Sequence, residues 1–286
     1  MEPTTDREGE NSMSYDIIVI GGGPAGLTAA IQGRVRGRTV LVVSNEPTAS
    51  PLCKAPEIEN YPGIPHVSGL GLVESMVEQA KALGAEIRQG RVIAVMSAGE
   101  SCFVSIGSDV VEGRTVILAM GVSRAAPLTG EMEYLGRGVS YCATCDGMFY
   151  RGKDIVVAGN APDLAEETEY LRGIGCHVKE VRLPGLTVLG EQKVTGVRTA
   201  DGEEIPCEAV FLLRATLVPD RMVPGVELEN AHIRVDRTMR TNLPGIFAAG
   251  DCTGQPLQLA KAVGEGQMAA HSADQYMEQL DKGKEA

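Results

Sequence analysis

Two cysteines at positions 142 and 145 are followed at once by an acidic residue, Asp146. Thiols at the spacing of Cys142 and Cys145 can close a disulfide and exchange it with a disulfide of another molecule. The adjacent carboxyl group can donate and accept the proton that this exchange moves near neutral pH. A structural zinc site would need a second pair of ligands, but the other cysteines and the 4 histidines show no ligand spacing. We therefore interpret the motif as a redox disulfide and expect no metal site.

A glycine-rich turn, residues 21–26, lies between an apolar run at residues 17–20 and apolar positions at helical spacing. A strand before such a turn and a helix after it are the context of a dinucleotide-binding site, in which glycines allow a pyrophosphate to approach the helix N-terminus. We expect the cofactor to be held by Gly21, Gly23, Pro24, Ala25 and Gly26.

The residue for the ribose hydroxyls is left open by the sequence. A second strand, predicted over residues 38–43, should be followed by an acidic side chain at this position. Instead the strand is followed by Ser44, with Glu46 two residues further on. Either side chain could bind the ribose.

A second strand–turn–helix unit begins at residues 154–159, but its turn is damaged. Only Gly159 of the glycine fingerprint is kept, Ala161 stands where close backbone approach requires glycine, and Pro162 is beside it. The following strand, predicted over residues 176–183, contains no arginine cluster for a 2′-phosphate. We expect no nucleotide here; the alternative is a variant loop that still binds a nicotinamide nucleotide.

The two units predict an α/β protein with two Rossmann-like, three-layer domains, the second inserted into the first. The first, dinucleotide-binding domain is expected over residues 15–120 and 228–286, the inserted domain over 121–227, and a disordered tail over 1–14. Apolar periodicity predicts further elements: helices at 71–83, 163–172 and 258–276, strands at 114–119 and 245–250, and a meander at 92–106.

Composition excludes several classes of function. The formal charge of −12 argues against a nucleic-acid binder, which needs basic residues to neutralise phosphates. No apolar run approaches the ~20 residues of a membrane helix, and residues 1–14 lack the apolar core of a signal peptide. An odd count of 7 cysteines fits a reducing compartment. We expect a cytoplasmic protein that binds neither nucleic acid nor membrane.

With these motifs identified, the chain resembles the low-molecular-weight flavoprotein thioredoxin reductases from residue 15 to residue 280. The resemblance rests on the turn at 21–26, residues 58–63 (IENYPG), CATCD at 142–146, Gly250-Asp251 and residues 262–270 (AVGEGQMAA). It implies FAD, with Asp251 on the ribityl chain and Gln258 near the flavin ring. It further implies that Cys145 faces the flavin, that Cys142 exchanges with thioredoxin, and that Asp146 is the acid–base. Other cofactor-binding positions that it suggests are Asn60, Gly121, Gly250 and Ala260.

Departures from the family pattern bear on the electron donor. Ordinary members carry an intact second glycine fingerprint and a His-Arg-Arg stretch for NADPH, and this chain has neither. The pattern is similar to that of ferredoxin-dependent flavin thioredoxin reductases, so the implied partners are ferredoxin and thioredoxin, with a homodimer as the assembly. The alternatives are an NADPH-dependent reductase with a divergent site, a diflavin-linked disulfide oxidoreductase, and a non-catalytic flavin redox sensor.

A local basic cluster has two interpretations. Arg34, Arg36 and Arg38 alternate at the end of the first predicted helix of an acidic protein. They could attract an acidic ferredoxin, or they could be cations at a helix C-terminus, where positive charge is favourable.

Overall fold

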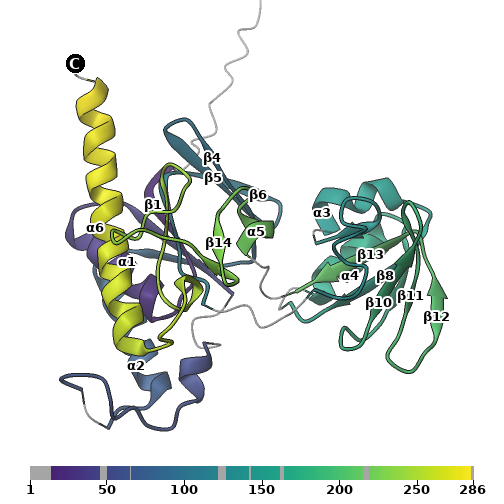
Figure 1. Cartoon of the computed structure of the whole chain (residues 1–286), viewed down its shortest axis with the longest axis horizontal. Helices are drawn as coiled ribbons and strands as arrows, with labels where there is room; N and C mark the ends of the chain where they lie inside the picture. The colour runs from purple at the N-terminus through teal and green to yellow at the C-terminus, as the bar shows by residue number, and fades with distance from the viewer. Residues whose placement is uncertain are drawn as a thin grey trace, which may run out of the picture.

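The structure, a computed structural model, describes residues 14–45, 50–64, 66–121, 127–141, 143–161, 164–214 and 219–284, with Pro51 and Cys145 described by backbone only. The chain forms two lobes (Figure 1). Both ends of the described chain build the larger lobe and its middle builds the smaller one, so the second domain is inserted into the first. The α/β class with two Rossmann-like units is confirmed.

A seven-stranded sheet forms the centre of the larger lobe, in the order β3-β2-β1-β6-β5-β4, with β16 also paired to β6. Strands β1, β2, β3, β6 and β16 are parallel, whereas β4 and β5 form an antiparallel meander on the first half of β6. The strands are β1 (Ser14–Ile20), β2 (Val40–Ser44), β3 (Glu86–Gln89), β4 (Val92–Ala98), β5 (Ser101–Ile106), β6 (Asp109–Leu118) and β16 (Ile246–Ala248).

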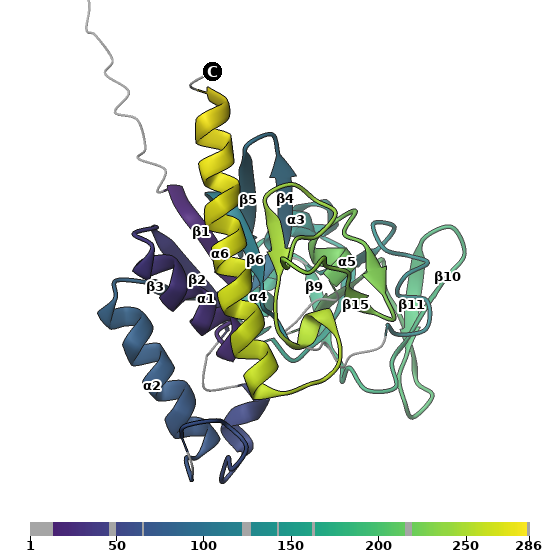
Figure 2. The ribbon, with the colours of Figure 1, turned by 60° about the vertical axis from the view of Figure 1, so that its left-hand side comes forward.

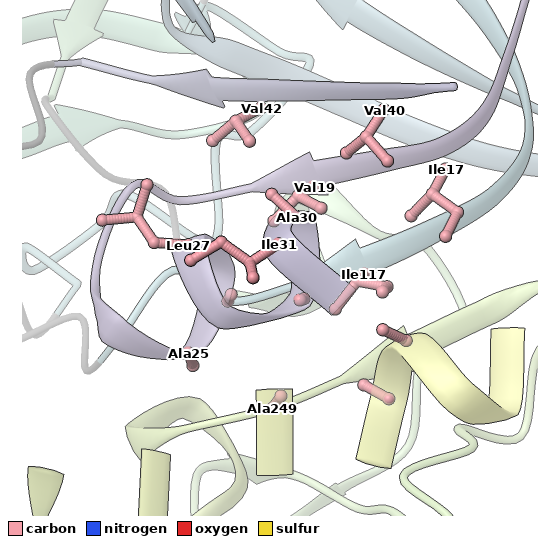
Figure 3. Packing of buried hydrophobic residues seen from close by; sticks show 14 of the residues in the cluster. Ile17, Val19, Ala25, Leu27, Ala30, Ile31, Val40, Val42, Ile117 and Ala249 are labelled. Atoms are coloured by element: carbon pink, nitrogen blue, oxygen red, sulfur yellow. The ribbon is translucent and has the colours of Figure 1, made fainter. Parts of the chain in front are cut away.

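Helices cover one face of this sheet: α1 (Pro24–Val35), α2 (Gly69–Ala82) and α6 (Leu259–Lys284), with the short helix η2 (Pro51–Lys54) near α2. In Figure 2, α6 runs alongside α1. Figure 3 shows the packing beneath them, where Leu27 and Ile31 of α1 face strand residues including Val19 and Val42. A Cβ on Gly266 of α6 would lie 2.2 Å from the carbonyl oxygen of Ala25, so the two helices approach at backbone distance.

On the other face, side chains of β1, β2 and β6 share an apolar cluster with side chains of β4 and β5 and of the returning chain. The returning chain includes α5 (Pro219–Met222), β14 (Leu228–Glu229), β15 (His232–Ile233) and η4 (Asp251–Thr253). Met222, Val223 and Val226 are buried in the core of the larger lobe. We expected the inserted domain to extend to residue 227, so this boundary needs correction. Apolar packing returns the chain to the larger lobe by Met222.

The smaller lobe repeats the same plan. A parallel sheet in the order β7-β13-β8-β9 has one apolar cluster on each face, and an antiparallel sheet in the order β10-β11-β12 packs on one of them. Its elements are β7 (Val139–Ser140), α3 (Ala143–Asp146), η3 (Gly147–Tyr150), β8 (Asp154–Gly159), α4 (Leu164–Gly173), β9 (His177–Glu180), β10 (Thr187–Gly190), β11 (Val194–Arg198), β12 (Glu204–Pro206) and β13 (Ala209–Leu213).

Two elements differ in length from the sequence-based expectation. Helix α6 continues to Lys284 instead of ending at residue 276, and ion pairs from its last turns to β6 and to the β4–β5 turn support the extension: Asp281 to Arg114 at 2.5 Å and Lys284 to Glu100. Strand β9 is shorter than predicted, because parallel pairing to β8 ends at Glu180. In the part of the chain that the structure describes, no helix is both long enough and apolar enough to cross a bilayer.

Candidate functional site

The first glycine turn fits a dinucleotide pyrophosphate. A Cβ on Gly21, where φ is +115°, would lie 2.2 Å from the carbonyl oxygen of Ala119, and a Cβ on Gly26 would lie 1.9 Å from that of Gly21. At Gly23 the surroundings differ, since no heavy atom lies within 4 Å of the Cβ position. Helix α1 begins at Pro24 with no capping side chain and no acidic residue in its first turn. Its N-terminus is therefore open to an anion.

The predicted cofactor residues meet at one edge of the large sheet because they follow strands that run parallel. Gly21 follows β1, Ser44 ends β2, Gly121 follows β6 and Gly250 follows β16. The register aligns these strand ends, with Ile20 opposite Val43 and Leu118, and Leu118 opposite Ala248. Ligands of α/β sheets bind outside the carboxyl ends of the strands. Ser44 is partly buried there, whereas Glu46 lies outside the described residues.

Helix α6 fixes the loop that contains Gly250 and Asp251. The Glu265 carboxylate (Oε2) accepts hydrogen bonds from the Gly250 amide and the Thr253 hydroxyl, each at 2.8 Å. Lys261 Nζ donates to the Gly250 carbonyl at 2.9 Å. With φ at +86°, Gly250 adopts a backbone conformation that favours glycine. The loop is thereby held rigidly at the mouth of the glycine turn.

The Asp251 carboxyl is partly buried within this loop. Burial raises the pKa of Asp251 above its ordinary value of 3.8, Glu265 raises it further, and Lys261 opposes both. A carboxylate held in this way gains by accepting hydrogen bonds from ligand hydroxyls. The position suits a ligand that presents hydroxyl groups.

Two further predicted residues come together from distant parts of the chain. Asn60 Nδ2 donates to Gln258 Oε1 at 3.2 Å, and both side chains are exposed. Ala260, in the first turn of α6, is exposed beside Gln258. These residues form an exposed group at the N-terminal end of α6.

The redox motif lies in and before α3 of the smaller lobe. Cys142 is outside the described residues and Cys145 is described by its backbone alone. The Asp146 carboxylate (Oδ2) accepts a hydrogen bond from the Ser140 hydroxyl at 2.7 Å. The Tyr141 hydroxyl donates to Glu131 Oε1 at 2.9 Å. Hydrogen-bonded side chains thus hold the backbone on both sides of the motif.

The second glycine turn is built differently from the first. A Cβ on Gly159 would lie 1.9 Å from the carbonyl oxygen of Leu213, so this glycine is required for packing. Ala161 is buried in the apolar cluster of the lobe, and its amide donates to the same carbonyl at 3.1 Å. Ala161 therefore stands, with its methyl group packed in the core, at the position in the turn that Gly23 has in the first turn. Pro162 lies outside the described residues.

Two basic side chains near the end of β9 are engaged with carboxylates. Glu180, the last residue of the strand, accepts from Arg172 at 2.6 Å, and Lys179 donates to Glu203 at 2.9 Å. A 2′-phosphate would have to compete with these carboxylates for Arg172 and Lys179, and Glu180 would repel it.

A family model described as pyridine nucleotide-disulphide oxidoreductase matches residues 15–184 and 185–266. The chain belongs to this family. It is 35% identical to a thioredoxin reductase from Listeria innocua, in an alignment covering 95% of this chain and 97% of that relative. Among solved structures, a ferredoxin-flavin thioredoxin reductase from Clostridium acetobutylicum has 37% identity and a TM-score of 0.84, covering 94% of this chain and 99% of that one. A thioredoxin reductase from Gloeobacter violaceus has 32% identity and a TM-score of 0.76, covering 93% and 95% of the two chains.

These similarities confirm the resemblance to thioredoxin reductases. The chain is an oxidoreductase of the thioredoxin reductase group, for which a flavin is the cofactor and thioredoxin the substrate. The geometry of the glycine turn at residues 21–26 fits the flavin nucleotide that this membership implies.

Four buried charged residues near the redox motif of this protein were not predicted from the sequence. Arg214 makes two hydrogen bonds of 2.8 Å to the Glu131 carboxylate, and Arg91 donates to Glu167 Oε1 at 2.7 Å. The partners are separated by 83 and 76 positions in the chain. No motif or periodicity marks such a pair, so only the folded arrangement reveals it.

The remaining cysteines are poor candidates for redox chemistry. Burial raises the pKa of Cys102 to about 11 and that of Cys207 and Cys252 to about 12. It also raises the pKa of Cys53 and Cys176. Because the thiolate is the reactive form, these five residues are weaker nucleophiles near neutral pH than an ordinary cysteine. Within the described ranges, no group of three or more potential metal ligands occurs.

Proposed function

We propose that this protein is a ferredoxin-dependent flavin thioredoxin reductase. In this proposal, electrons from reduced ferredoxin pass through FAD to the Cys142–Cys145 disulfide and then to thioredoxin. The observation that carries the choice of donor is the contrast between Gly23, with open space at its Cβ position, and the buried Ala161. The first turn has room for a pyrophosphate at its second glycine, whereas the second turn has lost that glycine and packs Ala161 into the core.

The larger lobe supplies the FAD site. Gly21, Gly23 and Gly26 would bring the N-terminus of α1 to the pyrophosphate, and Asp251 would accept hydrogen bonds from the ribityl chain. Asn60 and Gln258 would lie nearer the ring. When bound, FAD supplies the ability to accept single electrons and to deliver a pair of them to a disulfide.

The two thiols of the reduced motif would reduce thioredoxin by thiol–disulfide exchange. The Cys142 thiolate attacks one sulfur of the thioredoxin disulfide, forming a mixed disulfide and releasing the other thioredoxin sulfur as a thiolate, which takes up a proton. The Cys145 thiolate then attacks the Cys142 sulfur, which reforms the internal disulfide and releases the second thioredoxin thiol. Asp146, hydrogen-bonded to Ser140, would exchange the protons.

An exposed apolar surface beside the motif supports a protein substrate. Met148 and Phe149 follow the motif on η3 and are 55% and 73% exposed. Large apolar side chains this exposed are suited to contact with a partner protein. We place thioredoxin on this side of the smaller lobe.

The interpretation of the arginine cluster as a ferredoxin-docking patch is not favoured. Arg38 donates to Asp274 at 2.6 Å, and Arg34 donates to the backbone carbonyls of Leu83 and Arg38. Their charges hold the end of α1 against α6 and the α2–β3 turn, which supports the helix-end interpretation. The proposal therefore assigns no docking site to ferredoxin.

One alternative has a specific observation in its favour. The matching family model carries pyridine nucleotide in its description, and the Listeria relative is called a thioredoxin reductase without mention of ferredoxin. An NADPH-dependent enzyme with a divergent site would fit both.

The homodimer and the alternation of lobe orientations during turnover are also part of the proposal.

The proposed function is tested by steady-state reduction of thioredoxin with each donor in turn. Reduced ferredoxin should support turnover, whereas NADPH and NADH should give less than a hundredth of that rate. Equal or faster turnover with NADPH would establish the alternative instead. Formation of a redox-dependent complex with no turnover from any donor would favour the sensor hypothesis.

A further inference from the structure

We propose that Arg91 is a positioning residue that fixes the orientation of the two lobes and holds the chain where it enters the redox motif. Arg91 belongs to the larger lobe, at the corner between β3 and β4. Its Nη2 donates to Glu167 Oε1 at 2.7 Å, and its Nη1 donates to the Tyr141 carbonyl at 3.0 Å. Glu167 and Tyr141 both belong to the smaller lobe, and Tyr141 directly precedes Cys142.

The burial of this contact is unusual for charged groups. The side chains of Arg91 and Glu167 are 2% and 9% exposed. Charged residues reach such burial almost only when they are paired. Because the two partners belong to different lobes, this burial exists only while the lobes keep the described orientation.

The geometry of the contact selects one orientation. A guanidinium is a rigid planar fork, so its two donors require two acceptors in a fixed arrangement. Here one acceptor is a carboxylate in the first turn of α4, and the other is a backbone carbonyl beside β7. A rotation of the smaller lobe would move both acceptors relative to Arg91 and break both hydrogen bonds together.

The energetics allow the contact to open during turnover. A buried ion pair gains little net stability over its separated, hydrated charges, whereas losing one partner from a buried pair is strongly unfavourable. Glu167 also gains from the N-terminus of α4, which favours a carboxylate. The pair thus specifies an orientation without holding it irreversibly, as a reductase that serves two protein partners in turn requires.

Small-angle X-ray scattering of the oxidised, flavin-loaded protein tests this inference without depending on activity. Wild-type protein should give the scattering profile of the described lobe orientation, calculated for the assembly present in solution. Arg91→Met and Glu167→Gln should each shift the ratio of described to rotated forms at least tenfold towards the rotated one, with a different scattering profile. The matched controls Arg88→Met, in β3, and Glu166→Gln, an exposed neighbour in the same turn of α4, should leave the profile unchanged.

The double variant Arg91→Met/Glu167→Met separates positioning from general destabilisation. Two apolar side chains can share the buried site, so the described orientation should return. Because an apolar contact between the lobes is harder to separate than the ion pair, kcat for thioredoxin reduction should fall at least tenfold with little change in KM. Of the measurements named here, only this kinetic one rests on the proposed function. Thermal melts identify any single variant that fails to fold. In that case the scattering profile of the double variant alone tests the inference.

Wild-type scattering from folded single variants, or a rotated profile from the double variant, would overturn the inference. Loss of turnover in wild-type protein with every donor would instead count against the proposed function. The scattering result would stand in that case.

Discussion

Asn60 and Gln258, 198 positions apart in the chain, meet through a hydrogen bond of 3.2 Å between Nδ2 and Oε1. One residue follows η2 and the other immediately precedes α6. The contact joins two separately predicted cofactor-binding positions at one end of the larger lobe. It supports a single binding site whose parts come from distant segments.

This contact leads to the first prediction. Asn60→Ala and Gln258→Ala should each weaken FAD binding by up to about tenfold, because a hydrogen bond contributes about 0.5–1.5 kcal/mol. The double variant should lose less than the sum of the two, because each single change already breaks the shared contact. Both side chains are exposed, so the apoprotein should keep its melting temperature. Fluorescence titration of apoprotein with FAD measures the affinities, and strictly additive losses would contradict a shared site.

Asp251→Asn should separate stability from cofactor binding. Because the pKa of Asp251 is raised in the folded protein, the folded protein binds more protons than the unfolded protein at pH values between the unfolded and the folded pKa. Asp251 therefore lowers the free energy of unfolding increasingly as pH rises through this range. The uncharged amide removes this effect. At pH 7 the variant apoprotein should be at least as stable as wild type, with the difference vanishing below the ordinary pKa of 3.8.

FAD affinity of Asp251→Asn should fall, because the amide is a weaker acceptor for ligand hydroxyls than a carboxylate. Urea unfolding of the apoprotein at several pH values and FAD titration supply the two measurements. A destabilised apoprotein that binds FAD normally would show that Asp251 serves the fold instead of the cofactor.

The two motif cysteines should have distinct roles. Cys142→Ser should leave flavin reduction by ferredoxin intact and abolish thioredoxin reduction, because the nucleophile for the partner is lost. Cys145→Ser should stop the reaction at the mixed disulfide between Cys142 and thioredoxin, because the enzyme has no thiol of its own left to resolve it. Non-reducing electrophoresis and flavin absorbance report the two outcomes. Loss of flavin reduction in Cys142→Ser would reject the role assignment.

Core packing beneath α1 gives a stability prediction. Leu27 is 0% exposed in the cluster between α1 and the sheet. Leu27→Ala should lower the free energy of unfolding of the apoprotein by about 2–5 kcal/mol, because it removes apolar contacts and leaves a cavity. Val35→Ala, on the same helix but 63% exposed, is the matched control and should change it by less than about 0.5 kcal/mol. Similar losses for both variants in urea unfolding would contradict the packing.

Local patterns were sufficient to predict the fold and the elements that position the candidate flavin site. The apolar run at residues 17–20 and the glycines after it predict β1, the turn and α1 because sterics and burial act over short distances there. The same holds for β16 and the Gly250-Asp251 turn. The parallel strands then bring these turns to one edge of the sheet.

Other features depend on contacts that no local pattern encodes. The return of Met222 and Val223 to the larger lobe depends on which apolar surface they cover, and the prediction placed this boundary too late. The Arg91–Glu167 and Glu131–Arg214 pairs join isolated charged residues far apart in the chain. The choice between Ser44 and Glu46 for the ribose stays a prediction, because Glu46 lies outside the described residues.

The central claim concerns the electron donor, and an anaerobic titration of the flavin absorbance tests it most directly. The flavin band at about 450 nm should stay unchanged on addition of NADPH and then NADH, because the second turn has Ala161 where the close approach of a pyrophosphate requires glycine. Reduced ferredoxin should then bleach the band, and oxidised thioredoxin should restore it. Rapid bleaching by NADPH at micromolar concentration would contradict the account and make this protein a pyridine-nucleotide-dependent thioredoxin reductase with an altered turn.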